Sequence, residues 1–179
     1  MLKREQCALV VIDVQGKLAS LMVDAEGLIQ RLAVLIRGAR LLDLPVVWVE
    51  QNPKGLGPTH PTLQAELEGL PCYHKMAFGC GAEPELLAAI NQLGRNQLLL
   101  CGIETHVCVY QSARQLLEQG FQVEVVIDAV ASRTEANRQL GLDKMQQLGA
   151  SLTGIEMALF ELTERCDDPV FKSVLALVK

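Results

Sequence analysis

The sequence predicts an α/β fold, a three-layer α/β/α sandwich built around a mostly parallel open sheet. Short runs rich in Val, Leu and Ile alternate with longer amphipathic stretches, which is the pattern of parallel strands joined by crossover helices. Gly94, Gly120 and Gly149 each follow an amphipathic stretch where a helix ends, and a hydrophobic run resumes soon after each glycine. Since no linker, repeat or low-complexity tract interrupts the pattern, we expect one domain that covers residues 1–179.

The first half of the chain supplies two predicted core strands, at residues 7–12 and 45–49, because both runs are apolar and of strand length. Between them, residues 25–42 have apolar side chains at three- and four-residue spacing, which predicts a helix. Residues 51–71 break both patterns, because the segment NPKGLGPTHP contains three prolines and two glycines. We expect a long loop there, which is a candidate lid or wall of a site. The short run PCYH that follows could form a further strand.

The second half continues the alternation. Helices are predicted at residues 83–93, 106–118 and 135–148, and strands at 98–101 and 123–127. A last amphipathic helix, 169–178, could dock on its own core or on a neighbouring subunit. In open sheets of this kind, ligands bind beyond the carboxyl ends of the strands, so we expect the chemistry at strand ends.

Composition and charge exclude several classes of function. The formal net charge is -5 and the Lys and Arg residues are scattered, which argues against nucleic-acid binding. No apolar run is long enough to span a bilayer, and the chain enters its first strand without a signal-peptide pattern, so we expect no membrane partner and a cytoplasmic location. Half of the residues are hydrophobic, which is high for a monomer and favours a homo-oligomer.

The predicted position of Cys108 is typical of a catalytic nucleophile. In the segment LLLCGIETHVCVY, a strand runs into a turn at Gly102, Thr105 is a suitable N-cap, and Cys108 falls in the first helical turn. The positive end of that helix would lower the thiol pKa from about 8.5, and the same amides could hold an oxyanion. The alternative is a buried structural cysteine, since free cysteine is often buried.

The other five cysteines are expected to be reduced and structural, because the chain has no CxxC pair and is too long to need a disulfide framework. Cys7 and Cys101 lie in strand runs, Cys72 and Cys80 flank a polar loop, and Cys166 is expected near the end of a late helix.

Two charged residues could complete a catalytic site with the thiol. Asp13 follows the first predicted strand, where it could act as a general base or, alternatively, cap the next helix. Lys75 lies between PCYH and the apolar residues 76–78, so its ammonium group is either partly buried or simply solvated. Together, a carboxylate, an ammonium and a thiol could activate the thiol and stabilise developing negative charge.

The motifs around these residues resemble those of the isochorismatase-like cysteine hydrolases, and among them the small isochorismatase domain-containing proteins. They are VVIDVQ, EQNPKGLGPT, HKMAFGC, LLLCGIETHVCV and VEVVIDAVASR, which together span nearly the whole chain. The resemblance implies a Rossmann-like fold with Asp13 as base, Lys75 as electrostatic partner and Cys108 as nucleophile. It also implies a cis peptide bond between Ile103 and Glu104, and an oxyanion hole formed by the amides of Glu104 and Cys108.

The chain departs from the family at the metal site of the nicotinamidase branch, which has an aspartate and histidines after the second strand. This chain has Glu50, Gln51 and Asn52 there, so we predict no catalytic metal and no cofactor. His60 and His74 lack a recognisable ligand spacing.

We expect the substrate pocket to differ in shape from that of other members, since Leu18 replaces a frequent aromatic residue and Gly79 a frequent serine. The residues expected to bind the substrate are Gln15, Leu18, Gln51, Phe78 and Thr105. His106, in the first turn of the catalytic helix, either contacts the substrate or faces solvent.

The leading hypothesis is a metal-independent hydrolase that attacks a small carbonyl substrate, by preference an amide, through Cys108. Hydrolysis of a vinyl ether, the reaction of isochorismatases in the narrow sense, need not use the thiol. Two alternatives come from other classes of function: a catalytically idle scaffold or binding protein of the same fold, and a redox sensor in which Cys108 forms a disulfide with Cys72 or Cys80.

Overall fold

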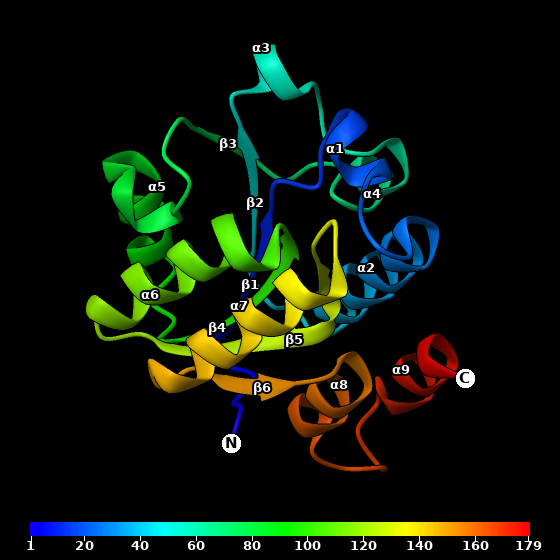
Figure 1. Cartoon of the computed structure of the whole chain (residues 1–179). Helices are drawn as coiled ribbons and strands as arrows, with labels where there is room; N and C mark the ends of the chain where they lie inside the picture. The colour runs from blue at the N-terminus through cyan, green and yellow to red at the C-terminus, as the bar shows by residue number, and fades with distance from the viewer.

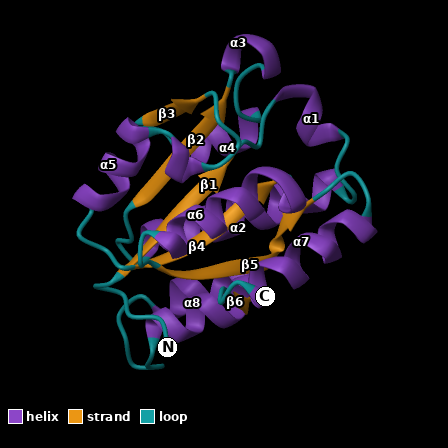
Figure 2. Ribbon diagram, turned by 60° about the vertical axis from the view of Figure 1, so that its left-hand side comes forward, coloured by secondary structure: helices purple, strands orange, loops and turns teal.

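The computed structural model describes residues 1–179 and contains one six-stranded sheet in the order β3-β2-β1-β4-β5-β6. Every neighbouring pair of strands is parallel. The strands are β1 (Cys7–Ile12), β2 (Val46–Gln51), β3 (Cys72–Lys75), β4 (Gln97–Ile103), β5 (Gln122–Ala131) and β6 (Ser151–Thr153). Helices cover both faces of this sheet (Figures 1 and 2), so the predicted three-layer α/β/α architecture is confirmed.

The helices form two layers, each with its own buried apolar cluster. On one face lie α2 (Ala25–Leu41), α8 (Ile155–Thr163) and α9 (Phe171–Val178), with α1 (Gly16–Ser20) and α4 (Pro61–Glu66) beside them; on the other lie α5 (Pro84–Gln92), α6 (Tyr110–Glu118) and α7 (Glu135–Gln147). Alternate residues of β1 supply the two clusters, Leu9 and Val11 the first and Val10 and Ile12 the second. The strand is therefore apolar throughout, because both of its faces are buried.

The segment 51–71 is more ordered than the sequence predicts. It contains two short helices, α3 (Pro53–Leu56) and α4, and each begins with a proline. Proline is well suited to the first position of a helix, where its missing N–H would have no partner, so the expectation of one long loop is wrong. Cys166 lies beyond the end of α8 and is exposed, unlike the other five cysteines.

β4 runs further than predicted because Gly102 lies inside the strand and does not form a turn. Its φ is +115°, and a Cβ atom there would lie 2.0 Å from the carbonyl oxygen of Ile12 on β1. The register between β4 and β5 shifts at the same point, as in a β-bulge. Only glycine allows β4 to approach β1 so closely, and this approach brings the two strand ends together.

The order of the strands reverses between β1 and β4, and this reversal locates the site. β2 and β3 extend the sheet on one side of β1, and β4, β5 and β6 extend it on the other. Ligands in such sheets bind at the carboxyl ends beside the reversal. Asp13 directly follows β1, Glu104 directly follows β4, and α3 stands above these strand ends at the top of Figure 1.

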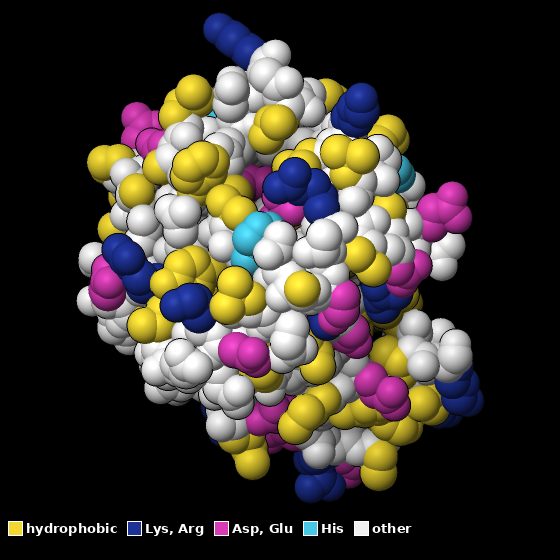
Figure 3. All heavy atoms as spheres, in the orientation of Figure 1, with side chains coloured by type: hydrophobic (Ala, Val, Ile, Leu, Met, Phe, Trp, Pro, Cys, Tyr) yellow, Lys and Arg dark blue, Asp and Glu magenta, His cyan; other side chains and the backbone are white.

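The surface charge and the helices concern two expectations from the sequence, that the chain binds no nucleic acid and has no membrane partner. On the face drawn in Figure 3, basic and acidic side chains are interspersed and no broad basic area is present. None of the helices combines the length and the apolar composition needed to cross a membrane.

Candidate active site

Asp13 and Lys75 form a buried ion pair at the carboxyl ends of β1 and β3. Their side chains are 1% and 0% exposed, and Lys75 Nζ lies 2.6 Å from Asp13 Oδ2. The ammonium group also donates to the backbone oxygens of Ala77 (3.1 Å) and Phe78 (2.8 Å). Buried charges are costly unless they are paired and hydrogen bonded, so each residue needs the other. A solvated Lys75 and a helix-capping Asp13 are therefore both wrong, since Gln15 has the N-cap position of α1.

Cys108 reaches this ion pair through the side chain of Gln51. The thiol Sγ lies 3.1 Å from Gln51 Oε1, and the same oxygen lies 3.3 Å from Lys75 Nζ. Asp13 Oδ2 is occupied by Lys75, whereas Asp13 Oδ1 is buried and has no hydrogen-bond partner. The structure thus brings the carboxylate, the ammonium and the thiol into one cluster.

Cys108 lies in a π-helical turn, Thr105–Val109, that joins β4 to α6. Such turns are rare in proteins, and those that occur are often found at functional sites. The predicted N-cap at Thr105 is wrong, because Glu104 has that position and the Thr105 hydroxyl is buried without a partner. Gly141 of α7 packs directly on this turn: a Cβ atom there would lie 2.9 Å from the Cα of His106. The close approach of α7 therefore holds the turn that contains Cys108 in place.

The thiol of Cys108 is not ionised in advance. Burial, and then the negative charge of Asp13, raise the pKa of Cys108 to about 12, and Lys75 opposes them only in part. Burial also raises the pKa of Asp13 above its usual range, while Lys75 acts in the opposite direction. The lowered thiol pKa expected from the helix terminus is therefore wrong, because desolvation and the adjacent carboxylate outweigh it.

Two side chains that follow β4, those of Glu104 and His106, are held by the chain after β5. The peptide bond between Ile103 and Glu104 is cis. The Glu104 carboxylate accepts hydrogen bonds from the backbone N–H and from Nε of Arg133, at 3.1 and 3.0 Å. His106 Nδ1 lies 2.9 Å from Ser132 Oγ, so its ring is held by the chain that follows β5.

A pocket with a volume of about 260 Å³ opens over the thiol. Its lining residues are Leu18, Gln51, Asn52, Leu56, Phe78, Glu104, Val107 and Cys108. Three of the five residues expected to bind the substrate are among them: Leu18, Gln51 and Phe78. Three further lining residues, Asn52, Leu56 and Val107, were not predicted. Asn52 and Leu56 lie in the segment 51–71, which was expected to form a lid or a wall of the site.

Gln15 and Thr105, the other two residues expected to bind the substrate, are fully buried and do not line the pocket. The carboxamide of Gln15 donates to the backbone oxygens of Gln51 (3.1 Å) and Gly57 (2.7 Å), and it accepts from the Gln51 N–H at 2.7 Å. Because all of these partners are backbone groups, Gln15 ties the end of β1 to β2 and to the chain after α3. It positions Gln51, which faces the pocket.

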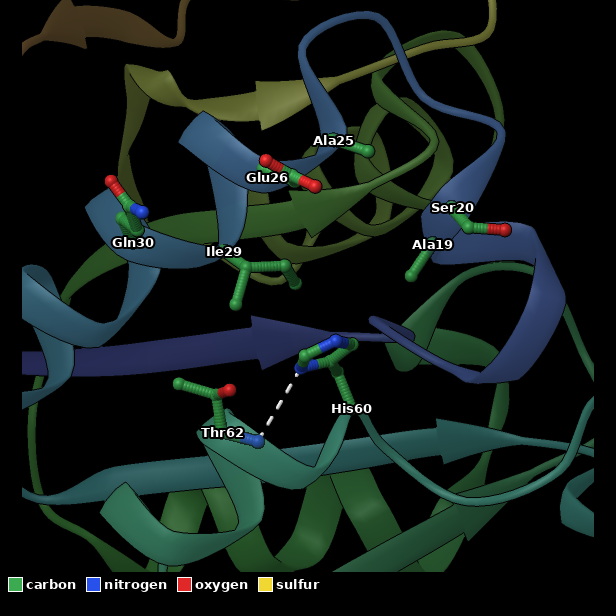
Figure 4. Close-up of a pocket in the computed structure, with 8 residues that line it drawn as sticks. All are labelled: Ala19, Ser20, Ala25, Glu26, Ile29, Gln30, His60 and Thr62. Carbon is green, nitrogen blue, oxygen red and sulfur yellow. Dashed lines mark hydrogen bonds between the residues drawn. The ribbon is translucent and has the colours of Figure 1, made fainter.

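A larger hollow, of about 500 Å³, lies between α1, α2 and the start of α4 (Figure 4). Its lining residues are Ala19, Ser20, Ala25, Glu26, Ile29, Gln30, His60 and Thr62. His60 Nδ1 accepts a hydrogen bond from the Thr62 N–H at 3.4 Å, as Figure 4 shows. No member of the Asp13, Lys75 and Cys108 cluster lines this hollow, so the smaller pocket, which Cys108 lines, is the candidate active site.

The parallel sheet, the pocket at its strand reversal and the buried thiol beside an ion pair define an α/β protein of hydrolase type. The family model of the isochorismatase domain matches residues 7–157. The chain belongs to the isochorismatase family, as its motifs predicted.

Two relatives match nearly the whole chain. Isochorismatase domain-containing protein 2 from Bos taurus is 40% identical over 172 residues, which cover 96% of this chain and 82% of the relative. Secreted isochorismatase effector Isc1 from Phytophthora sojae (strain P6497) is 38% identical over 175 residues, which cover 96% of this chain and 83% of the relative. Because one relative is a secreted protein, the cytoplasmic location of this chain stays a prediction.

Two solved structures share the fold. MAR1 ribonuclease from Caenorhabditis elegans matches with a TM-score of 0.93 at 38% identity, covering 99% of this chain and 91% of that chain. The YcaC gene product from Escherichia coli, an octameric hydrolase of unknown specificity, matches with a TM-score of 0.91 at 27% identity, covering 98% and 87%. The whole sheet and its helices are thus those of isochorismatase-family structures.

Proposed function

We propose that this protein is a metal-independent cysteine hydrolase that cleaves a small uncharged amide through a thioester intermediate. The observation that carries the proposal is the linked geometry of the three side chains. The Cys108 thiol lies 3.1 Å from a carboxamide oxygen that also contacts Lys75, and the partner of Lys75, Asp13, keeps one carboxylate oxygen without a hydrogen bond. A thiol, a base for its proton and a cation that orients the base are the parts that nucleophilic acyl transfer needs.

In the first half of the reaction, Cys108 Sγ bonds to the carbonyl carbon while its proton passes to Asp13. The electron pair of the C=O double bond moves to oxygen, and the backbone amides of Glu104 and Cys108 stabilise the resulting oxyanion. Asp13 then gives the proton to the substrate nitrogen, the C–N bond breaks and the amine leaves. A thioester on Cys108 remains.

In the second half, Asp13 takes a proton from water as the oxygen attacks the thioester carbon. The C–S bond breaks, the acid leaves, and the sulfur recovers the proton held by Asp13. Lys75 keeps the carboxylate oriented throughout and offsets its charge. Because the resting thiol has a raised pKa, proton transfer accompanies the attack instead of preceding it.

The lining of the pocket favours an uncharged substrate. Glu104 contributes a carboxylate to the wall and no lysine, arginine or histidine lines the pocket, while Arg133 is paired with Glu104 and Lys75 with Asp13. An anionic substrate would therefore meet a negative charge and no free cation. The rest of the lining is apolar apart from the carboxamides of Gln51 and Asn52, which can hydrogen bond a neutral amide.

A panel of small primary amides, assayed by release of ammonia, tests this proposal, with each neutral amide paired with an analogue that carries an extra carboxylate. We expect turnover of neutral members and loss of at least about 10³-fold in Cys108→Ala, because the nucleophile is removed. Cys166→Ala is the matched control, since that thiol is exposed and lies beyond α8. Mass spectrometry of a quenched reaction should find the acyl group on Cys108. Amide turnover that survives Cys108→Ala would contradict the mechanism.

The redox alternative receives no support from the site. A redox-sensing thiol needs a low pKa, whereas burial raises the pKa of Cys80 to about 11 and that of Cys108 to about 12. The idle-scaffold alternative predicts no acyl-enzyme on Cys108 with any member of the amide panel, so the same experiment separates it from the enzyme.

We also propose that the chain forms a homo-oligomer. The Escherichia coli relative is octameric, and Met76 and the pocket-lining Phe78 are large apolar side chains exposed to solvent. Sedimentation velocity of the purified chain tests this, and a monomer at micromolar concentration would contradict it.

The name of the Caenorhabditis elegans relative raises the question of ribonuclease activity. The net charge of -5 and the small pocket favour a small-molecule substrate, and we expect no cleavage of RNA.

A further inference from the structure

A second cluster of reactive side chains lies on the β2–β3 edge of the sheet. Glu50 of β2 and Cys72 and His74 of β3 each offer one ligand atom, and these three atoms all lie within 4.8 Å of one another. Glu50 is paired with His74 in the parallel register, and Cys72 is two positions before His74, so the three side chains project from one face. Gln51 and Lys75, the next residues on the two strands, project from the other face into the active site.

The carboxylate of this cluster is held by an outer layer of hydrogen bonds. Glu50 is buried, and its Oε1 accepts from the Thr59 N–H at 2.7 Å and from the Thr59 hydroxyl at 2.8 Å. The indole of Trp48 donates to the same hydroxyl at 2.8 Å. Glu50 Oε2 is left to face His74, whose Nε2 lies 3.6 Å away. Metal-binding carboxylates are typically oriented by outer hydrogen bonds of this kind.

We propose that Glu50, Cys72 and His74 bind a zinc ion, with water as the fourth ligand. A thiolate, an imidazole and a carboxylate suit Zn²⁺, whereas Mg²⁺ and Ca²⁺ prefer oxygen ligands only. Zinc bonds of about 2.0 to 2.3 Å require ligand atoms roughly 3 to 4 Å apart, so a shift of about 1 Å closes the site. The His74 side chain is 61% exposed and free to make that shift. Binding releases the Cys72 thiol proton to solvent, and no oxidation occurs.

The position of the site indicates a supporting role. A zinc ion here would join β2 to β3, a four-residue strand at the edge of the sheet. His74 directly precedes Lys75, and Glu50 directly precedes Gln51, so the ion would steady the two strand ends that hold active-site side chains. It would touch neither the thiol of Cys108 nor the pocket, and its binding is independent of the proposed amide hydrolysis.

Titration of the purified chain with Co²⁺ tests the proposal, because a thiolate bound to Co²⁺ gives a charge-transfer band in the near ultraviolet. We expect one equivalent to bind and Zn²⁺ to displace it. Cys72→Ser should abolish the band, and His74→Ala should weaken binding by at least about 10-fold. Cys108→Ser and His60→Ala are the matched controls and should leave the band unchanged.

Three results would overturn the assignment. They are the lack of a band with stoichiometric Co²⁺, a band that survives Cys72→Ser, and a band that disappears in Cys108→Ser, which would place the metal at the catalytic thiol. If Cys72→Ser does not fold, the Co²⁺ affinity of His74→Ala tests the site instead, because the largely exposed His74 side chain can be removed without disturbing the core. Unchanged Co²⁺ affinity in His74→Ala would then contradict the site.

Discussion

Replacement of Asp13 by asparagine should separate thiol reactivity from catalysis. Three contacts link the thiol to the carboxylate: Cys108 Sγ to Gln51 Oε1 (3.1 Å), Gln51 Oε1 to Lys75 Nζ (3.3 Å) and Lys75 Nζ to Asp13 Oδ2 (2.6 Å). The sulfur therefore lies at most about 9 Å from the carboxylate. At an effective dielectric constant of about 20, one charge at about 9 Å contributes about 1.8 kcal/mol, which exceeds one pKa unit. Loss of that negative charge should therefore lower the pKa of Cys108 and raise the thiolate fraction at least about 20-fold at neutral pH.

The assay is alkylation by iodoacetamide at pH 7.5, followed for each cysteine by peptide mass spectrometry. We expect Cys108 of Asp13→Asn to react faster than in the unaltered chain, while amide hydrolysis is lost because the base is gone. The exposed Cys166 serves as an internal reference in every sample, and Cys101, which is fully buried, should stay unlabelled as long as the chain is folded. Slower alkylation of Cys108 in Asp13→Asn would refute the assignment of its raised pKa to the neighbouring carboxylate.

Further predictions concern pH and packing. Lys75→Met should move the acid limb of the kcat/KM profile to higher pH, because Lys75 lowers the pKa of Asp13; an unmoved limb would exclude Asp13 as the base. Burial raises the pKa of Cys80 from 9.0 to about 11, so the unfolded chain loses this proton first. Between pH 9 and 11 the free energy of unfolding, measured in urea titrations, should therefore fall more steeply in the unaltered chain than in Cys80→Ala, by up to about 1.4 kcal/mol per pH unit. Gly102→Ala should cost about 3 kcal/mol in the same assay and Gly120→Ala about 1 kcal/mol, because only the first alanine meets a neighbouring strand; equal costs would refute the packing argument.

The layers of the fold could be predicted from the sequence because apolar runs and helical spacing are local patterns. The run at residues 7–12 was predicted with the bounds that β1 has, since both of its faces are buried. The end of β4 was not predicted, because the role of Gly102 depends on the carbonyl of Ile12 on β1, which is distant in the sequence. The helices of segment 51–71 were not predicted, because proline usually interrupts regular structure. Here Pro53 and Pro61 each occupy the first position of a helix instead.

The candidate site was predictable only in part, for a similar reason. Position at strand ends indicated Asp13 and Cys108, since the carboxyl ends of parallel strands share one edge. The contacts of Gln51 could not be read from the sequence, because they depend on how three distant segments meet. The direction of the Cys108 pKa was missed for the same reason: a helix terminus is a local signal, whereas burial and the Asp13 charge arise from the folded chain.

The ion pair between Glu104 and Arg133 has a consequence for how new specificities could evolve. The Arg133 side chain is 56% exposed, and its guanidinium is directed by the Glu104 carboxylate at the pocket wall. One codon change from glutamate to glutamine would remove that anion and release the guanidinium for an incoming carboxylate. Under the proposed mechanism Cys108 and Asp13 would be inherited intact, so a lineage with this fold could pass from neutral to acidic substrates in a single mutational step.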